Sequence, residues 1–427
     1  MKKKQFLWLM IAIGMLSTGS GCDSVKPVST TQEIPTAEET NLVTTAPVSE
    51  GEQPAETTTV PQIADVLTTA ATTPTTTGEE YEDTSLVELL MERMTLEQKV
   101  CQMFIVTPES LTGYNGAVTE AGALSKESFT AYPVGGLIYF SDNLEDAPQT
   151  VSMLSTMQDY AQETTGVGLF LSVDEEGGTV VRVSKYPAFR DTPFLSPQEL
   201  YAQGGWDGVY QETIEKGNLL KSLGINLCLA PVADISNNPT DYIYERTFGG
   251  SAEDTSQFIE ISTKAYRETN TGCTLKHFPG YASNLNTHNG SSVDNREQSQ
   301  FYGNDLKPFQ AGIDAGAPVV MVNHNIVSCF DAENPASISP EVHSVLRKDL
   351  HFSGLICTDS LDMGATKNIT DVYLKAVDAG NDLIATCETA GYPIVLQAVH
   401  TGRISENRVN ESVIRILAYK LYYGLMS

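Results

Sequence analysis

Short apolar runs alternate with longer amphipathic stretches along the chain after residue 85. Each run has the length of one buried strand, and the stretches between them carry apolar residues at helical spacing. This alternation is typical of parallel βαβ units, and eight units predict a closed (β/α)8 barrel of the TIM type. An open doubly wound sheet is the alternative, but no glycine-rich phosphate loop follows an early run. The eight runs are 102–106, 136–140, 168–173, 225–232, 272–275, 319–322, 355–357 and 382–386.

Helices are predicted between these runs and at both ends of the barrel. Thr95 and Gln98 have the spacing of a capping box, so a helix is expected to begin directly after Thr95. A last helical pattern at 406–423 is expected to close the barrel. The internal helices are predicted at 146–162, 211–223, 252–269, 305–315 and 340–349.

Polar residues stand at the ends of five consecutive apolar runs. The carboxyl ends of barrel strands meet at one mouth, so these side chains are expected to lie close together. Taken singly, each has an ordinary explanation: Asp359 could cap the next helix, and His324 could be a hydrogen-bonded histidine beneath the mouth. The prediction therefore rests on the set. Its members are Asp174, Glu175 and Glu176, then Asp234, Lys276 and His277, Asn323 and His324, and Asp359.

Composition narrows the classes of partner. The 427 residues carry a net charge of -28, which argues against nucleic acid as a partner and against a polybasic membrane contact.

Histidines 343, 351 and 400 lie in helical or turn contexts and are expected to have structural roles only. No metal or organic cofactor is expected, because the histidines and carboxylates lack ligand-like spacing. Six cysteines, at 101, 228, 273, 329, 357 and 387, are expected to be small buried apolar residues.

The first residues have the pattern of an export signal. Lysines at 2–4 precede an apolar segment at 6–15, which is too short to span a bilayer, and small residues lead to Cys22. Residues 1–21 are therefore predicted to be a signal peptide. Residues 20–22 resemble the end of a bacterial lipobox, although Gly19 stands where that pattern has an aliphatic residue. We expect an outward-facing lipoprotein anchored to the cell membrane through lipidated Cys22, or a secreted protein.

The segment 22–84 is rich in Thr, Pro and Glu and is predicted to be a disordered linker. It carries too few apolar residues to offset its chain entropy by burial. Behind a membrane anchor, such a spacer would let a domain reach into a polymer such as cell wall. The remaining chain, 85–427, is predicted to be a single catalytic barrel.

Six motifs give the barrel a specific resemblance. In the same order, they are similar to the catalytic barrel of glycoside hydrolase family 3, in particular its bacterial β-N-acetylglucosaminidase (β-hexosaminidase) branch. The resemblance runs from about Leu86 to the C-terminus. The motifs are Asp-Glu-Glu-Gly-Gly at 174–178 with Arg182, Ala-Pro-Val-Ala-Asp at 230–234, Glu-Arg-Thr-Phe-Gly at 245–249, Lys-His-Phe-Pro-Gly at 276–280, Pro-Ala-Ser-Ile-Ser at 335–339 and Thr-Asp-Ser-Leu-Asp-Met at 358–363.

The resemblance implies a retaining mechanism with named residues. Asp359 falls on the family's nucleophile and His288 on the general acid/base. A histidine can replace the usual second carboxylate because it titrates near neutral pH and does not repel an anionic acceptor. The positions that contact the sugar hydroxyls in the first subsite are Asp174, Arg182, Arg246, Lys276 and His277.

One departure from the branch lies on the acid/base loop. The branch reads Asp-Ser-His or Asp-Thr-His, whereas this chain reads Asn286-Thr287-His288. An amide can hydrogen-bond the imidazole but supplies no negative charge to stabilise its protonated form. Residues 281–283 also differ, with Tyr-Ala-Ser in place of His-Gly-Asp, and the loop is one residue shorter than the commonest version. We therefore hypothesise a weakened or altered general acid in which Asn286 takes the place of the aspartate.

Three functions follow as hypotheses. The first is a hydrolase that removes terminal β-linked N-acetylglucosamine from cell-wall or chitin-type oligosaccharides through a covalent glycosyl-aspartate intermediate. The second is a phosphorylase of the same family, with phosphate in place of water as acceptor. The third is a surface lipoprotein that binds glycan without cleaving it, although a pure binder would not need a nucleophile. In each case the partner is a glycan containing β-linked N-acetylglucosamine.

Overall fold

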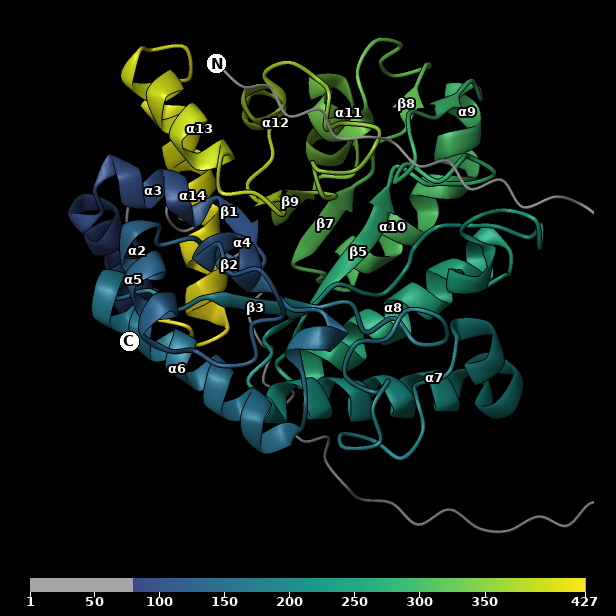
Figure 1. Cartoon of the computed structure of the whole chain (residues 1–427). Coiled ribbons are helices and arrows are strands. Elements are labelled where there is room, and N and C mark those ends of the chain that lie inside the picture. The colour runs from purple at the N-terminus through teal and green to yellow at the C-terminus, as the bar shows by residue number, and fades with distance from the viewer. Residues whose placement is uncertain (1–79, 427) are drawn as a thin grey trace, which may run out of the picture. The chain divides into compact units, whose positions relative to one another are not determined.

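The computed structural model describes residues 80–426, and the predicted eight-stranded parallel barrel is confirmed (Figure 1). The strands follow the order β10-β1-β2-β3-β4-β5-β7-β9, and Cys357 of β9 pairs with Leu383 beside β10 to complete the circle. Every predicted apolar run overlaps one strand, and β5 and β9 extend beyond the ends of their runs. The strands are β1 (Phe104–Val106), β2 (Gly136–Ile138), β3 (Phe170–Val173), β4 (Leu227–Cys228), β5 (Gly272–Phe278), β7 (Val319–Val322), β9 (Leu355–Thr358) and β10 (Ile384–Ala385).

Burial explains why the strands could be predicted from the sequence. All residues of β1, β3, β7 and β9 are buried, as expected where helices cover one face of a parallel strand and the barrel interior the other. Leu137 of β2 pairs in parallel with Leu171 of β3, and neither is exposed to solvent. A strand buried on both faces is a continuous apolar run.

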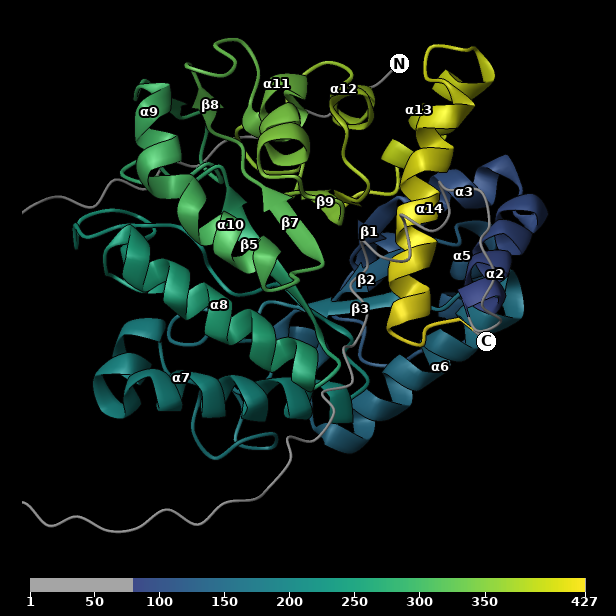
Figure 2. The ribbon, with the colours of Figure 1, turned by 180° about the vertical axis from the view of Figure 1, so that it is seen from behind.

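The helices form the outer layer. Seen from behind, α7, α8 and α10 lie side by side outside the strands (Figure 2). The capping box of Thr95 and Gln98 is confirmed. The longer helices are α2 (Glu80–Arg93), α3 (Leu96–Gln102), α5 (Ala123–Ala131), α6 (Ala147–Thr165), α7 (Pro197–Ser222), α8 (Ala252–Glu268), α10 (Leu306–Asp314), α12 (Val372–Ala379), α13 (Gly391–His400) and α14 (Glu406–Tyr422). Shorter ones are α4 (Pro108–Thr112), α9 (Gln298–Gln300) and α11 (Pro340–Ser344).

The start of α7 differs from the prediction. The helix begins at Pro197, after a capping box formed by Ser196 and Glu199, and not near residue 211. Gly205 lies in this first part with a φ of 58°, so the helix is kinked there. The kink interrupts the apolar spacing, which is why the sequence pattern showed only the second half.

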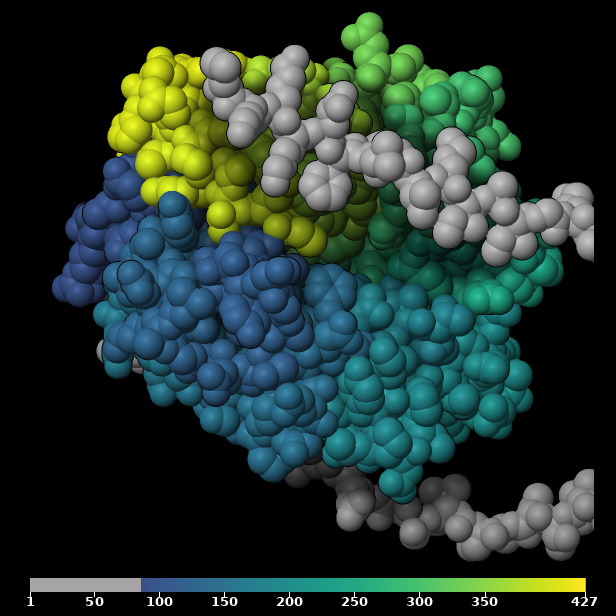
Figure 3. All heavy atoms as spheres, viewed as in Figure 1, coloured from purple at the N-terminus to yellow at the C-terminus, as the bar shows by residue number. Residues whose placement is uncertain are grey.

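The two ends of the barrel meet. Helix α14 packs against α2 and α3, and α13 against α3, so that segments from both ends of the described chain share one face (Figure 3). The buried side-chain nitrogen of Lys420 donates to Gln102 Oε1 at 2.6 Å and to the Gly135 carbonyl at 2.9 Å. The predicted C-terminal helix thus closes the barrel. Within residues 80–426, no helix combines the length and apolar character needed to cross a membrane.

The cysteine prediction is only partly right. Cysteines 101, 228, 273 and 357 are buried, but Cys329 is partly buried and Cys387 is exposed. Cys387 lies two residues after the end of β10, where the chain leaves the barrel. The predicted signal peptide 1–21 and Cys22 lie outside the described residues, as does most of the linker. The domain boundaries therefore stay predictions, with α2 beginning at Glu80, shortly before residue 85.

Candidate active site

A cavity of about 240 Å³ opens where the strands end, and it gathers residues from distant parts of the chain. A larger cavity, of about 360 Å³, lies where β7 and β9 begin, and no predicted site residue lines it. The chemistry therefore identifies the smaller cavity as the candidate site. Seven predicted residues line it: Asp174, Arg182, Arg246, Lys276, His277, His288 and Asp359. The eighth, Asn286, lies beside His288 on the same loop.

Strand β5 extends further than expected and carries two site residues inside it. The prediction ended the strand at Leu275 and put Lys276 and His277 just beyond it, at the mouth; the end of the strand is wrong, whereas both side chains do line the cavity. Both lie within β5 and are only 2% and 4% exposed. The register shifts between Leu275 and Phe278, where β5 pairs with β7. Burial of these polar residues is possible because each finds a charged or hydrogen-bonding partner.

Lys276 is the centre of a group of paired charges, which we call the ionic cluster and which also contains Asp174, Glu176 and Arg246. Its ammonium lies 2.7 Å from Asp174 Oδ1 and 2.6 Å from Glu176 Oε1. Arg246 donates to both carboxylate oxygens of Glu176, at 2.8 and 2.7 Å. Burial alone would lower the pKa of Lys276, but Asp174 and Glu176 outweigh it and raise that pKa. The cluster thus keeps Lys276 charged at the floor of the cavity.

Arg182 reaches the cavity from a loop that Glu175 holds in place. The buried Glu175 carboxylate accepts the backbone N–H groups of residues 182–184, at 2.8, 2.7 and 3.2 Å, and the hydroxyl of Ser184. The Arg182 guanidinium lies 3.5 Å from Asp174 and 5.4 Å from the ring centroid of Phe140. Glu175 therefore faces the protein and Asp174 faces the cavity.

His277 has a defined tautomer. The Arg246 guanidinium lies 3.2 Å from Nε2, and because arginine only donates, Nε2 is the acceptor. The proton is therefore on Nδ1, which donates to Asp234 Oδ2 at 2.7 Å. Asp234 also accepts the backbone N–H of His277 at 3.0 Å. Asp234 thus fixes both the backbone and the ring of His277.

Asp359 directly follows β9 and is partly exposed to the cavity. It caps no adjoining helix, because α12 begins only at Val372. Burial would raise the pKa of Asp359, but the imidazoles of His324 and His277 and the N–H of Ser360 outweigh it and lower that pKa. Asp359 is therefore ionised at neutral pH, as its predicted role of nucleophile requires.

His324 lies beneath Asp359 with both ring nitrogens hydrogen-bonded, which is the ordinary explanation that the sequence had left open for it. Burial lowers its pKa, so the ring is neutral. Nε2 donates to the Ser360 carbonyl at 2.8 Å, and Nδ1 accepts the hydroxyl of Ser337 at 2.7 Å. His324 therefore fixes the backbone that carries Asp359.

The loop after β5, residues 281–297, brings His288 over the cavity. Asn286 Oδ1 accepts two bonds from this residue, from the backbone N–H at 3.0 Å and from ring Nδ1 at 2.7 Å. With the proton on Nδ1, the lone pair of Nε2 is free. The Tyr242 ring, which also lines the cavity, lies 6.5 Å from the imidazole between centroids. The catalytic roles of His288 and Asn286 stay predictions.

Glu176, Asp234 and His324 were expected at the mouth, but no individual role was predicted for them. Glu176 and Asp234 stood at recognised strand ends, but strand-end position does not tell which carboxylate faces the cavity and which faces a cation. His324 was recognised only as a residue beneath the mouth. Among residues 80–426, no group of three or more His, Cys, Asp or Glu side chains is placed to hold a metal ion.

An eight-stranded barrel with a carboxylate, an imidazole and paired cations at its mouth has the architecture of a barrel glycoside hydrolase. Residues 95–419 match the family described as glycosyl hydrolase family 3 N terminal domain, so the chain belongs to this family.

Relatives and a solved structure agree with this assignment. Beta-hexosaminidase A of Pseudoalteromonas piscicida is 27% identical over 69% of this chain and 54% of its own length. Beta-hexosaminidase of Stenotrophomonas maltophilia is 28% identical, over 66% of this chain and 84% of its own. A family 3 β-N-acetylglucosaminidase from Paenibacillus superposes with a TM-score of 0.72 at 31% identity, covering 78% of this chain and 63% of that one. The chain thus spans little more than half the length of the first of these relatives.

Proposed function

We propose that the chain is a retaining glycoside hydrolase that removes terminal β-linked N-acetylglucosamine from cell-wall or chitin-type oligosaccharides. The observation that carries the proposal is the single cavity that Asp359 and His288 share with the ionic cluster. Membership of glycosyl hydrolase family 3 supports the reaction class. The names of the relatives, beta-hexosaminidase and β-N-acetylglucosaminidase, support the sugar.

In the first step, a carboxylate oxygen of Asp359 attacks the anomeric carbon as the bond to the leaving oxygen breaks. The protonated imidazole of His288 gives its Nε2 proton to that oxygen, so no alkoxide is released. In the second step, water gives a proton to Nε2 and attacks the anomeric carbon, which frees Asp359. Two inversions give overall retention of configuration.

The charges around the cavity suit a sugar ring. Lys276 has three N–H groups and uses two on Asp174 and Glu176, which leaves one for a hydroxyl. Asp174 can accept from a hydroxyl, and Arg182 can donate to one. Hydrogen bonds to fixed groups orient the ring for attack and can strengthen in the transition state. Glu176 is 6% exposed and meets the cations, so we assign it a positioning role.

Turnover of an aryl β-N-acetylglucosaminide by the full chain tests the proposal, with the matching glucoside beside it. Asp359→Asn should lower kcat by roughly a thousandfold or more, as for other removed nucleophiles. Asp159→Asn, on the exposed face of α6, should change nothing. Unchanged hydrolysis by Asp359→Asn would refute the mechanism. The same assay with inorganic phosphate distinguishes hydrolysis from phosphorolysis, because only the latter yields a sugar phosphate.

We also propose that the protein is exported and held at the outer face of the cell membrane through a lipid on Cys22. The support is the sequence of the leader, residues 1–21, and the small residues before the cysteine. An anchor followed by the 22–84 segment would let the barrel reach glycans of the cell wall.

A further inference from the structure

The tip of the 281–297 loop rests on the chain that follows Asp359. Gly364 donates its N–H to the His288 carbonyl at 3.1 Å, and Ala365 donates to the Thr287 carbonyl at 3.1 Å. The receiving segment, 363–366, is a turn closed by a bond from the Thr366 N–H to the Met363 carbonyl at 3.0 Å. One short segment therefore carries Asp359 at its start and supports the backbone of His288 at its end.

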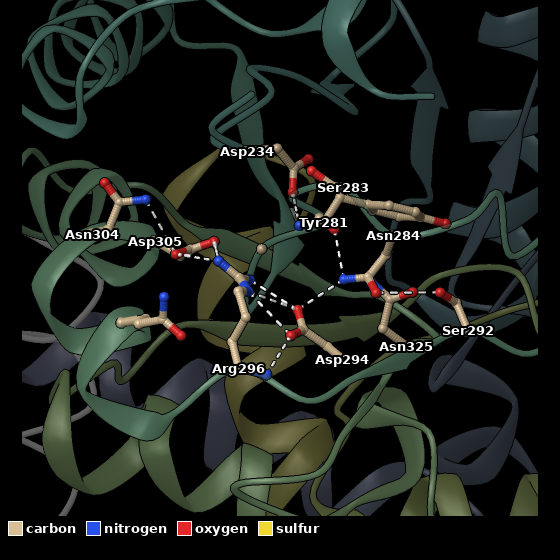
Figure 4. A network of polar contacts seen from close by, with 12 residues as sticks. Asp234, Tyr281, Ser283, Asn284, Ser292, Asp294, Arg296, Asn304, Asp305 and Asn325 are labelled. Atoms are coloured by element: carbon tan, nitrogen blue, oxygen red, sulfur yellow. Dashed lines mark hydrogen bonds and ion pairs between the residues drawn. The ribbon is translucent and has the colours of Figure 1, made fainter. Parts of the chain in front are cut away.

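The two ends of the loop are anchored independently of that turn. At the entry, Tyr281 donates its N–H to Asp234 at 2.6 Å. At the exit, strand β6 (Val293–Asp294) pairs with β8 (Ile326–Val327). Figure 4 shows Arg296 between Asp294 and Asp305, at 2.9 Å from each, while Asn284 reaches Asp294 from the other side at 2.8 Å. Between these anchors, the position of the loop tip, residues 287–289, depends on the contacts that the tip itself makes.

The tip has two such contacts, one on each side. From inside, the Tyr281 hydroxyl accepts the N–H of Thr287 at 3.2 Å and hydrogen-bonds its hydroxyl, and Thr287 is fully buried. From outside, the 363–366 turn supplies two N–H groups. His288 itself is exposed, so packing does not hold its side chain. The position of its imidazole follows from the position of the backbone at 287–289 and from the hydrogen bond of ring Nδ1 to Asn286 on the same tip.

Gly364 allows this close approach because it has no side chain. A Cβ atom there would lie 2.6 Å from the His288 oxygen, 2.8 Å from the Asn289 carbonyl carbon and 2.9 Å from the Gly290 nitrogen. All three are backbone atoms, so no rotation of a flexible side chain could relieve the contact. A side chain at 364 must therefore push the tip of the loop away from the turn.

From this geometry we infer that Gly364 is a positioning residue for the acid/base: the 363–366 turn is the seat that sets the distance from His288 to Asp359. The inference rests on the proposed function and deepens it. Because the seat belongs to the segment that carries the nucleophile, any shift of Asp359 along this segment carries the seat with it. The separation between acid and nucleophile is then kept even though the two residues lie on different loops.

The test compares Gly364→Ala with Gly303→Ala in the full chain, on two β-N-acetylglucosaminides. Nothing lies within 4 Å of a Cβ at Gly303, which makes it a matched control. On a methyl glycoside, whose leaving group needs the acid, Gly364→Ala should lower kcat by roughly a hundredfold, the scale of a 1 Å misplacement. On a dinitrophenyl glycoside the phenolate leaves without the acid. A burst of phenolate from the first step should therefore persist. The second step, attack of water on the glycosyl-enzyme, needs the base. Azide needs no base, so added azide should attack in place of water and restore turnover.

Tyr281→Phe removes the inner contact without adding volume and serves as the second variant. It should show the same dependence on the leaving group, to a smaller extent. Hydrogen exchange gives a readout that needs no activity: peptides covering 284–292 should exchange faster in Gly364→Ala than in the wild type and in Gly303→Ala.

Two outcomes would overturn the inference while leaving the proposed function intact. One is an equal loss of activity on both glycosides with no effect of azide. The other is unchanged exchange in the loop of Gly364→Ala. If the wild type hydrolyses neither glycoside, the proposed function fails, and faster exchange in the variant still establishes the seat.

Discussion

Glu176 is the residue whose loss should cost most stability in the site. Its carboxylate makes two bonds to Arg246 and one to Lys276, and the side chains of Glu176 and Lys276 are each 2% exposed. In Glu176→Gln, the two buried cations lose their shared counter-charge, and the new amide nitrogen faces a donor. Breaking a buried ion pair from one side costs about 3–5 kcal/mol. Asp174 still lies 2.7 Å from Lys276, so we expect the lower end, about 3 kcal/mol.

Urea unfolding followed by circular dichroism at pH 7 measures this loss. Glu163→Gln is the control, because it makes the same substitution in an exposed pair with Lys126 at 2.6 Å, which should contribute little. If the two variants were destabilised equally, the ionic cluster would not hold the site together as argued.

The difference should also depend on pH in one direction. Burial alone would raise the pKa of Glu176, but Arg246 and Lys276 outweigh it and hold that pKa below its ordinary value. A carboxyl of this kind stabilises fully above its unfolded-state pKa of about 4.3, and the contribution is lost as pH falls through the lower folded-state value. The gap between wild type and Glu176→Gln should therefore be constant from about pH 6 to 8 and narrow below about pH 4. A gap that widens on acidification would contradict the assignment.

Two further predictions concern Asn286, which departs from the family pattern, and Cys22, which follows the leader. Asn286→Asp places a carboxylate 2.7 Å from His288 Nδ1. Turnover of a substrate with a poor leaving group should therefore rise several-fold, and the alkaline limb of the pH profile should move to higher pH. An unchanged profile would mean that the amide of Asn286 supports His288 as well as a carboxylate does. Cys22→Ala should abolish incorporation of labelled fatty acid and release the protein from the membrane fraction, whereas persistent labelling would exclude Cys22 as the lipidated residue.

Much of the fold could be predicted because its signals are local. A parallel strand covered on both faces is mostly apolar, so each of the eight runs marked a strand without knowledge of its neighbours. The Thr95 capping box is equally local, since its partners stand three residues apart. Helix α7 was only half predicted because the kink at Gly205 shifts the apolar face partway along it.

The motifs in the sequence determined which residues gather at the mouth, because the carboxyl ends of all strands in a parallel barrel lie at the same face. Only the tertiary structure decided how they pair. Lys276 is a buried strand residue because Asp174, 102 positions earlier, lies within hydrogen-bond distance of it, and no local pattern contains that distance. Gly364 shows the same limit: its missing side chain matters only because the backbone of His288 passes where a Cβ would be. Residue types are written along the chain, whereas the energies of buried charges and close contacts depend on neighbours that folding alone brings together.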